Sequence, residues 1–260
     1  MESLGEVDAI AKGSFDVVTD ADLLAQEMIS DGIRAQFPDH QILAEEGYER
    51  GPASLDEFCW VIDPLDGTLN FALGIPCTSV SVALLHQGEP MLGCVYDPVR
   101  GELFEAQRGA GSSVNGGRLA VRPGTSALMP LGLSSGILSR IPAVGEVSLL
   151  AVIMRRFAKV RILGSQALHL CYVAAGRLQA AISWEARLWD DAAGALIVKE
   201  AGGQYTDFAG NKVFPLRAGS RALAGSAIHS IAASQPAHRE LVSVLGDLYS
   251  RSESAEENVD

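Results

Sequence analysis

The chain has 260 residues, of which 48% are hydrophobic, so it can bury the core of one enzyme-sized domain, although its length also permits two. Its net charge of −12 argues against binding to nucleic acid or to anionic membranes, because such binding depends on clustered Lys and Arg. The amino-terminal residues contain no apolar signal segment and no apolar run approaches the roughly 18 residues of a membrane span, so we expect neither export nor insertion.

The first part of the chain has the pattern of one helix followed by short buried strands. A start rich in Asp and Thr, followed by apolar residues at helical spacing, predicts an amphipathic helix from about Asp20 to Phe37. Two apolar runs, at 41–44 and 58–62, predict buried strands that lead directly into acidic residues. Further runs at 78–85, 90–97 and 101–107 are separated by turn-like segments, which predicts hairpins.

The pattern changes after a segment rich in Gly, Pro and Ser at 123–130. From there helical and strand-like runs alternate, which is typical of an α/β layer. These runs lie at 146–158, 159–163, 165–176, 178–183, 189–202, 204–208, 222–226 and 238–249. We expect a single domain over residues 1–250, divided into a subdomain of helix and antiparallel sheet at 1–125 and an α/β subdomain at 126–250, and then a disordered acidic tail at 251–260.

The four cysteines are scattered through apolar segments and show no paired CxxC spacing. They are Cys59, Cys77, Cys94 and Cys171. This pattern favours reduced thiols in a core over zinc sites or disulfides. We therefore expect a reducing, cytoplasmic location.

The stretch DPLDGTLNF runs directly on from a predicted strand. Asp63 and Asp66 can converge there beside the carbonyl oxygen of Leu65, and hard oxygen ligands of this kind suit Mg²⁺. The alternative is that Asp-Pro and Asp-Gly only mark a turn. Gly67 and Thr68 favour the metal site, because backbone N–H groups approach an anion closely at a glycine and the Thr hydroxyl can orient a water molecule.

The same stretch nearly matches the DxDGT signature of phosphatases that use an aspartyl nucleophile. In that signature the nucleophile lies two residues before the second Asp, a position held here by Pro64. Proline carries no nucleophilic group, so that mechanism is excluded at this site.

Three further acidic segments are consistent with a metal site. Each lies at a predicted strand end or helix start, where acidic residues are also favoured simply for capping and for the helix dipole. The residues are Asp16, Asp20 and Asp22, then Glu45 and Glu46, and finally Asp190 and Asp191. Their joint occurrence with Asp63 and Asp66 makes the capping explanation less convincing than it is for any one segment.

These four segments, in this order, resemble the motifs of the inositol monophosphatase family of Mg²⁺-dependent, lithium-sensitive phosphatases. The matching elements are DVVTDAD at 16–22, EE at 45–46, DPLDGTLNF at 63–71 and WDDAAG…EAGG at 189–203. The resemblance implies an α/β (α+β) fold with five layers, α-β-α-β-α, a site for two or three Mg²⁺ ions, and a homodimer.

The resemblance also implies a role for each matching residue. One metal ion would be held by Glu45, Asp63 and the Leu65 carbonyl, and a second by Asp63, Asp66 and Asp190. Glu45, with waters, would support a third, weaker ion. Of the implied catalytic residues Thr68, Asp22 and Glu45, the first two would orient the attacking water. The N–H groups of Gly67 and Thr68 would bind phosphate.

Substrate contacts are implied at Asp66, Gly164, Ser165, Gln166, Ser183 and Asp190. Family members that act on inositol phosphates have a Glu six residues before the Trp of the WD element, and Ser183 holds that position here. Glu185 lies two positions further on and is expected to point differently if the segment is extended. His169 lies in an apolar helical run and is expected to pack in the core. Only 15 residues precede Asp16, so the first family helix is expected to be shortened or missing.

We therefore predict a Mg²⁺-dependent phosphomonoesterase that cleaves a small polyol or sugar phosphate by direct attack of metal-activated water. Inositol 1-phosphate is the first candidate substrate. Histidinol phosphate, fructose 1,6-bisphosphate and adenosine 3′,5′-bisphosphate are alternatives with the same chemistry. A partner-binding regulatory protein that keeps the fold ranks lower, because none of the metal ligands is lost.

Overall fold

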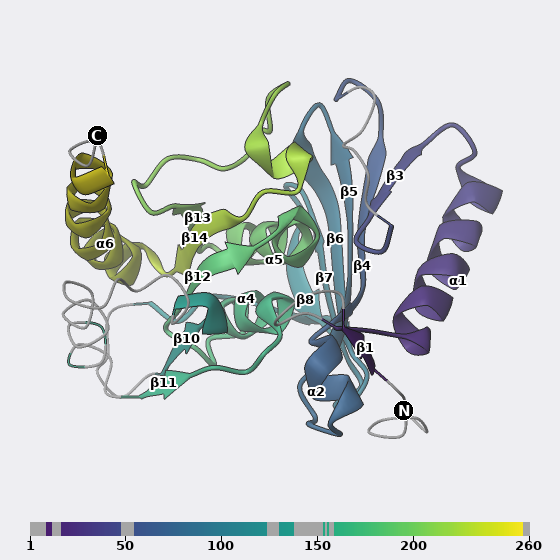
Figure 1. Ribbon diagram of the computed structural model, residues 1–260, viewed down its shortest axis with the longest axis horizontal. Helices are drawn as coiled ribbons and strands as arrows, with labels where there is room; N and C mark the ends of the chain where they lie inside the picture. Colours follow the sequence, from purple (N-terminus) through teal and green to yellow (C-terminus); the bar gives the residue numbers. More distant parts are fainter. Residues whose placement is uncertain are drawn as a thin grey trace.

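The computed structural model describes residues 9–11, 17–47, 55–123, 130–137, 153, 155 and 159–256, with side chains described only between Thr19 and Leu245. Figure 1 shows its five layers in the order helix, sheet, helices, sheet, helix. The helical layers are α1 (Asp20–Gln36), then α4 (Gln166–Ala174) with α5 (Leu188–Glu200), and finally α6 (Gln235–Glu256). The five-layer sandwich expected from the sequence is therefore confirmed.

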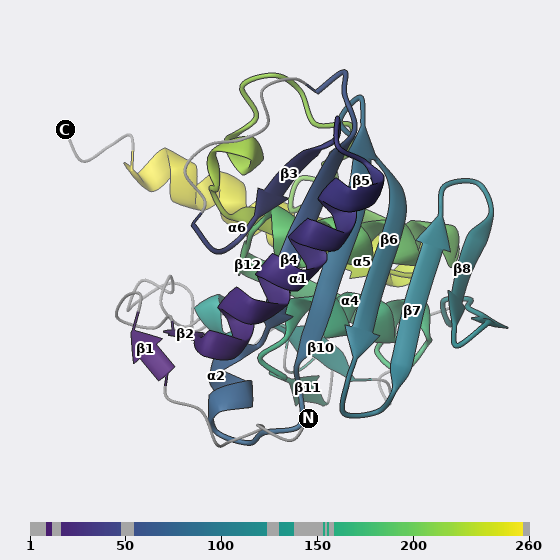
Figure 2. The same ribbon diagram turned by 90° about the vertical axis from the view of Figure 1, so that its right-hand side faces the viewer.

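The larger sheet has seven strands in the order β3-β4-β5-β6-β7-β8-β9. Its strands are β3 (Gln41–Ala44), β4 (Cys59–Asp66), β5 (Ser79–His86), β6 (Glu89–Asp97), β7 (Glu102–Gln107), β8 (Gly111–Val114) and β9 (Gly117–Arg118). Only β3 and β4 are parallel, and all other neighbouring strands in this sheet are antiparallel. Figure 2 shows α1 lying across the outer face of this sheet.

The smaller sheet has five strands in the order β11-β10-β12-β14-β13. They are β10 (Leu131–Leu133), β11 (Val160–Arg161), β12 (Ala180–Ala186), β13 (Gln204–Asp207) and β14 (Ile228–Ala233). The chain passes from one sheet to the other between Arg118 and Leu131, a range that contains the subdomain boundary expected near residue 125. A two-stranded pair, β1 (Ala9–Ala11) and β2 (Val17–Thr19), precedes α1.

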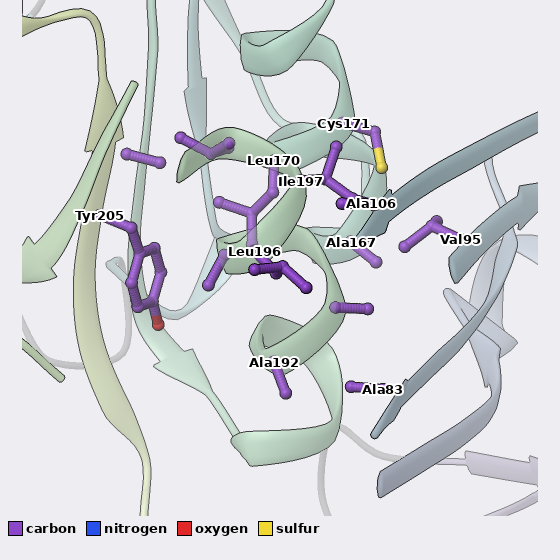
Figure 3. Close-up of a cluster of buried hydrophobic side chains, with 14 of the residues drawn as sticks. Ala83, Val95, Ala106, Ala167, Leu170, Cys171, Ala192, Leu196, Ile197 and Tyr205 are labelled. Atoms are coloured by element: carbon purple, nitrogen blue, oxygen red, sulfur yellow. The ribbon is translucent and has the colours of Figure 1, made fainter. Parts of the chain in front are cut away.

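The middle helical layer is largely buried because both sheets cover it, and most of its buried side chains are apolar. Figure 3 shows α5 between the strands of the larger sheet, which contribute Ala83, Val95 and Ala106, and Tyr205 of β13 on the opposite side. Close contact of α4 and α5 depends on Gly194, since a Cβ there would lie 2.6 Å from the Leu170 Cβ. This packing fixes the start of α5, which carries Asp190.

Several predicted elements differ from the structure. Residues 222–226 contribute to a 3-10 helix (Arg221–Ala224) rather than a strand, and β14 was not predicted. The helix expected at 146–158 falls outside the described residues except for Ile153 and Arg155, and Asp16 also lies outside them. Helix α6 runs to Glu256, six residues into the expected tail, because extending a formed helix through Ser, Glu and Ala costs little. Residues 257–260 are not described.

In the part of the chain that the structure describes, no helix combines the length and the apolar character needed to cross a membrane.

Candidate active site

Carboxylates from two neighbouring strands meet at one edge of the larger sheet. Strands β3 and β4 are parallel and pair Ala44 with Ile62, so Glu45 and Asp63 follow the paired residues at the same end. The Glu45 N–H donates to the Ile62 carbonyl at 3.1 Å, which continues the ladder to the acidic residue itself. The parallel register therefore brings together two acids that are 18 positions apart in the sequence.

A bulge in β4 separates the two aspartates of DPLDGTLNF. Asp63 pairs with Ser81 and Asp66 with Ser79, so three steps along β4 oppose two along β5. Such a bulge tolerates Pro64, which cannot donate a ladder hydrogen bond. The Leu65 N–H donates to Asp63 Oδ1 at 3.0 Å, which orients the Asp63 carboxylate.

Asp66 joins the larger sheet to the start of α4. Its Oδ2 accepts hydrogen bonds from Ser165 Oγ at 2.6 Å, from the Ala167 N–H at 2.7 Å and from Ser79 Oγ at 3.3 Å. Its Oδ1 accepts a longer bond of 3.2 Å from the Gln166 N–H. One carboxylate therefore holds two layers of the sandwich together, and Oδ1 keeps the greater capacity to bind another group.

Asn70 makes a second connection between the same layers. Its Nδ2 donates to the Cys77 carbonyl at 2.8 Å and to the Leu163 carbonyl at 2.7 Å. Gly164 follows with φ +77°, and a Cβ there would lie 2.6 Å from Asn70 Nδ2. Asn70 of the motif thus links the helix that follows β4 to the segment before α4, 93 positions away in the sequence.

Thr68 opens the short helix α2 (Thr68–Ala72) beside the buried Asp22. Its Oγ1 lies 2.9 Å from Asp22 Oδ1 and 3.0 Å from the Leu65 carbonyl oxygen, so its one proton has two acceptors. Asp22 Oδ2 also accepts bonds from the N–H and the hydroxyl of Thr19, at 2.8 and 2.5 Å. These bonds fix the Asp22 carboxylate facing Thr68, the pairing that the sequence resemblance implies.

Asp190 enters the site from the first turn of α5. Its Oδ2 accepts a hydrogen bond of 2.6 Å from the Arg187 N–H, which fixes the carboxylate at the helix start. Burial, followed by the charge of Asp66, raises the pKa of Asp190 well above its usual range. Burial and the charges of Glu45, Asp66 and Asp190 raise the pKa of Asp63 in the same way.

Burial also raises the pKa of Asp66, although the hydrogen bonds from Ser165, Ala167 and Gln166 oppose that shift. No ion pair between described residues includes Asp63, Asp66 or Asp190. Several buried carboxylates without basic partners repel one another, and bound cations would relieve that repulsion.

The donor set suits Mg²⁺, which prefers carboxylate and carbonyl oxygens. Glu45, Asp63, Asp66, Asp190 and the Leu65 carbonyl would hold it. Within the described part of the chain, no three Asp, Glu, His or Cys side chains stand close enough together to hold a metal ion as placed. The carboxylates of Asp66 and Asp190 instead accept hydrogen bonds from backbone N–H groups at the starts of α4 and α5.

A cavity of about 140 Å³ opens next to these carboxylates. All six residues expected to contact substrate line it: Asp66, Gly164, Ser165, Gln166, Ser183 and Asp190. Asp22, Glu45, Gly67 and Thr68 are not among its lining residues. The structure therefore brings the expected substrate residues to one cavity and places the expected water-orienting pair outside its lining.

Sequence reasoning missed four polar residues that line this cavity, Ser134, Ser135, His169 and Glu185. The expectation that Glu185 would point differently was wrong, because Glu185 lines the same cavity as Ser183. Residues two positions apart on a strand face the same side of the sheet. Glu185 Oε1 accepts bonds from Ser135 Oγ at 3.0 Å and from the Gly136 N–H at 2.7 Å. The strand period of two was the sequence signal that could have placed Glu185 beside Ser183.

A buried hydrogen-bond network supports the cavity from behind. Asp191 is fully buried, and its carboxylate accepts bonds from Gln166 Nε2 at 2.8 Å, Tyr205 OH at 2.6 Å and Ser230 Oγ at 2.9 Å. Burial raises the pKa of Asp191 to about 6, against the effect of these donors. The network fixes the Gln166 amide, which lines the cavity.

His169 is buried, as expected from its apolar surroundings. Its Nε2 accepts the Leu163 N–H at 3.2 Å, so Nδ1 carries the proton and faces Gln166 Oε1 at 3.4 Å. Burial lowers the pKa of His169 to about 4, so the ring is neutral at pH 7.

This shift predicts an acid sensitivity. The unfolded chain binds the His169 proton near pH 6.5 and the folded chain only near pH 4, so acidification through this window favours unfolding by about 3 kcal/mol. Urea unfolding at pH 7.5 and 4.5 measures the loss for the wild type and for His169→Gln. The variant is expected to show the smaller loss between the two pH values, and an equal loss would contradict the prediction.

Gly67 is expected to tolerate no side chain. Its φ is +90°, and a Cβ would lie 2.9 Å from the Cys77 carbonyl oxygen and 3.0 Å from that of Gly164. Gly67→Ala should therefore cost at least about 1 kcal/mol more in unfolding free energy than Gly101→Ala, where φ is +62° and the space is open. Chemical denaturation of both variants measures the two losses of unfolding free energy. Equal losses would show that the Cys77 and Gly164 carbonyl groups can move away from the added Cβ at little cost.

Comparisons with known proteins show the family to which the chain belongs. The model of the inositol monophosphatase family matches residues 2–243. The chain is 43% identical to the fructose-1,6-bisphosphatase/inositol-1-monophosphatase of Thermotoga maritima over 211 residues, covering 80% of this chain and 78% of that protein. It is 40% identical to the Nus factor SuhB of Vibrio cholerae over 213 residues, covering 81% and 79%.

The solved structure of a Thermotoga maritima IMPase superposes with a TM-score of 0.80 and 36% identity, covering 96% of this chain and 92% of that one. The chain therefore belongs to the inositol monophosphatase family. It is a phosphatase of that family.

Proposed function

We propose that this phosphatase is a Mg²⁺-dependent phosphomonoesterase acting on a small polyol or sugar phosphate, with inositol 1-phosphate as the first substrate to test. The observation that carries the proposal is the Thr68 hydroxyl, held between Asp22 and the Leu65 carbonyl beside the carboxylates at the end of β4. This is an arrangement for orienting a water molecule next to hard-cation ligands.

The chain's own groups divide the work of hydrolysis. The Thr68 hydroxyl would donate its hydrogen bond to Asp22, which leaves the hydroxyl oxygen able to accept a hydrogen bond from the attacking water and so to orient it. Gly67 and Thr68 would bind phosphate through backbone N–H groups at the start of α2. Bound Mg²⁺ would supply Lewis-acid chemistry, lowering the pKa of water and neutralising charge on the phosphate.

The cavity lining favours a hydroxylated leaving group. Ser183, Ser134 and Ser135 offer hydroxyls, and Glu185 offers a carboxylate that can accept hydrogen bonds from a polyol. Glu185 is thus proposed to take part in sugar recognition, a role the sequence comparison had placed at position 183. Histidinol phosphate, fructose 1,6-bisphosphate and adenosine 3′,5′-bisphosphate remain the alternative substrates, and the Thermotoga maritima relative is named for two activities.

The test is phosphate release by the purified chain from these four compounds, with Mg²⁺ and with EDTA. One clear preference in kcat/KM that disappears in EDTA is expected, because specificity is a difference in transition-state binding. Release that persists in EDTA would overturn the metal dependence. Absence of release from all four would overturn the proposed substrate class.

The water-orienting role of Thr68 makes a separate prediction. Thr68→Ala should lower kcat roughly 100-fold, while Thr68→Ser, which keeps the hydroxyl, should retain most of the activity. Steady-state kinetics on the preferred substrate decide between them. Equal losses in the two variants would show that the methyl group and not the hydroxyl is what matters.

A second candidate function rests on the relatives named Nus factor SuhB. In that case the chain would also bind a protein partner. A pull-down with the wild-type protein and with Asp63→Asn separates partner binding from catalysis. A regulatory partner is expected to bind both proteins, because partner binding would survive loss of the metal ligand. From the family resemblance we also propose that the protein is cytoplasmic and forms a homodimer. Light scattering of the purified protein would test the homodimer by measuring its molar mass.

A further inference from the structure

One side chain of α1 pairs with the backbone just beyond the end of β3. Gln26 Nε2 donates to the Glu46 carbonyl at 2.8 Å, and the Glu46 N–H donates to Gln26 Oε1 at 3.0 Å. A side-chain amide that exchanges both hydrogen bonds with one residue reproduces the pairing of a neighbouring antiparallel strand. Figures 1 and 2 both show α1 next to β3, so this pair joins the outer helical layer to the larger sheet.

Gln26 occupies the outer edge of β3. Among the described strands of the larger sheet, β3 stands first in the order and pairs only with β4. The Glu45 N–H points toward β4, where it donates to the Ile62 carbonyl at 3.1 Å. Successive residues of a strand direct their backbone groups to opposite edges, so the N–H and carbonyl of Glu46 point away from β4. The Gln26 amide therefore stands where a further strand would lie.

The two residues after β3 are held from opposite sides, Glu45 by β4 and Glu46 by α1. Gly47 follows with φ +72°, and a Cβ built there would have no neighbour within 4 Å, so packing at Gly47 does not restrain the chain. Glu45 is a proposed metal ligand, and its carboxylate can reach an ion only from where its backbone lies. Because Gln26 fixes the following residue, it limits the movement of that backbone.

Helix α1 also carries Asp22, which lies four residues before Gln26 and so on the same face of the helix. Asp22 accepts the hydrogen bond of the Thr68 hydroxyl at 2.9 Å, while Gln26 holds Glu46. One face of α1 therefore connects the end of β3 to the start of α2, two of the segments that form the proposed catalytic site.

We propose that Gln26 is a positioning residue for Mg²⁺ binding, whose amide holds the backbone of Glu46 and so keeps the Glu45 carboxylate in place to bind the ion. This inference rests on the proposed Mg²⁺-dependent function. Groups that orient a metal ligand change metal affinity about 10- to 100-fold when they are removed. Since the Gln26 amide is already bonded to the Glu46 backbone, it is expected to set the affinity for Mg²⁺ and not the rate of the chemical step.

Gln26→Met is the central test, because Met has nearly the volume of Gln but cannot donate to the Glu46 carbonyl and accepts only weakly. Calorimetric titration of the purified protein with Mg²⁺ alone should give a Kd about tenfold weaker for this variant than for the wild type. The Mg²⁺ concentration that gives half-maximal activity should shift in parallel, while kcat at saturating Mg²⁺ stays within about twofold of the wild type. Gln36→Ala, an exposed change on the same helix, should alter neither quantity.

A second variant separates the hydrogen bonds from packing. Gln26→Ala removes the bonds and the side-chain volume together, so it should weaken Mg²⁺ binding about as much as Gln26→Met does. An unaltered Mg²⁺ Kd in Gln26→Met, or a loss confined to kcat at saturating Mg²⁺, would overturn the positioning role and leave the proposed function intact. Failure of the wild type to bind Mg²⁺ would overturn the metal dependence of the proposed function together with this inference.

Discussion

Asp63→Asn is expected to abolish Mg²⁺-dependent phosphate release while leaving the metal-free protein at least as stable as the wild type. Asp63 is fully buried, and burial together with neighbouring carboxylates already raises its pKa, so a neutral amide removes repulsion. The Asn oxygen can still accept the Leu65 N–H. Loss of the carboxylate removes a ligand shared by both implied ions, so we expect kcat/KM to fall roughly 1000-fold or more.

Two measurements check this prediction. Steady-state phosphate release gives the loss of activity, and thermal unfolding with and without Mg²⁺ gives the linkage between metal and fold. Mg²⁺ should raise the Tm of the wild type and not that of the variant, because a ligand stabilises only the state that binds it. Asp39→Asn, an exposed substitution of the same chemistry, is the control. Retained activity, or an equal Mg²⁺ effect on Asp63→Asn, would place the metal elsewhere.

Asp191→Ala is expected to destabilise the fold by about 3 kcal/mol. Three buried donors, from Gln166, Tyr205 and Ser230, lose their acceptor at once, and a buried unsatisfied donor costs about 1–3 kcal/mol. The cost is less than the sum over three donors, because relaxation and water can satisfy some of them. Chemical denaturation at pH 7.5 measures the loss.

The matched variant for this network is Tyr205→Phe, which removes one donor and leaves the acceptor in place. It should cost about 1 kcal/mol, and the double variant should cost less than the two single losses together, since both act on the same bond. Strict additivity would mean that Tyr205 and Asp191 stabilise the fold independently, contrary to the network described above.

The sequence was sufficient to predict the elements that carry strong local signals. Helix α1 has a Thr cap and apolar spacing, and its observed range, Asp20–Gln36, differs from the predicted one by a single residue. Strands β3 and β4, which end at Ala44 and Asp66, were predicted from apolar runs followed by acids, a pattern that depends only on neighbouring residues.

Features that depend on distant pairing could not be predicted in this way. Glu185 accepts hydrogen bonds from Ser135 and Gly136, which lie 50 and 49 positions away in the sequence. Strand β14 has the sequence IHSIAA, in which His and Ser interrupt the apolar run. Asp191 gave the local signal of a helix start, yet its partners come from α4, β13 and β14, up to 39 positions away. Tertiary contact decided its environment.

The hydrogen bonds between Asp66 and the start of α4 have a consequence for ligand binding. In the proposed site this carboxylate would bind a cation while both of its oxygens also accept hydrogen bonds from the first turn of α4. A cation bound to Asp66 would weaken the hydrogen bonds that Asp66 accepts from Ser165 and Ala167. A change in those hydrogen bonds would in turn change the affinity of Asp66 for a cation. In the proposed site, cation binding and the position of the leaving group would therefore be coupled. A mutation that changes the affinity for one would also change the affinity for the other.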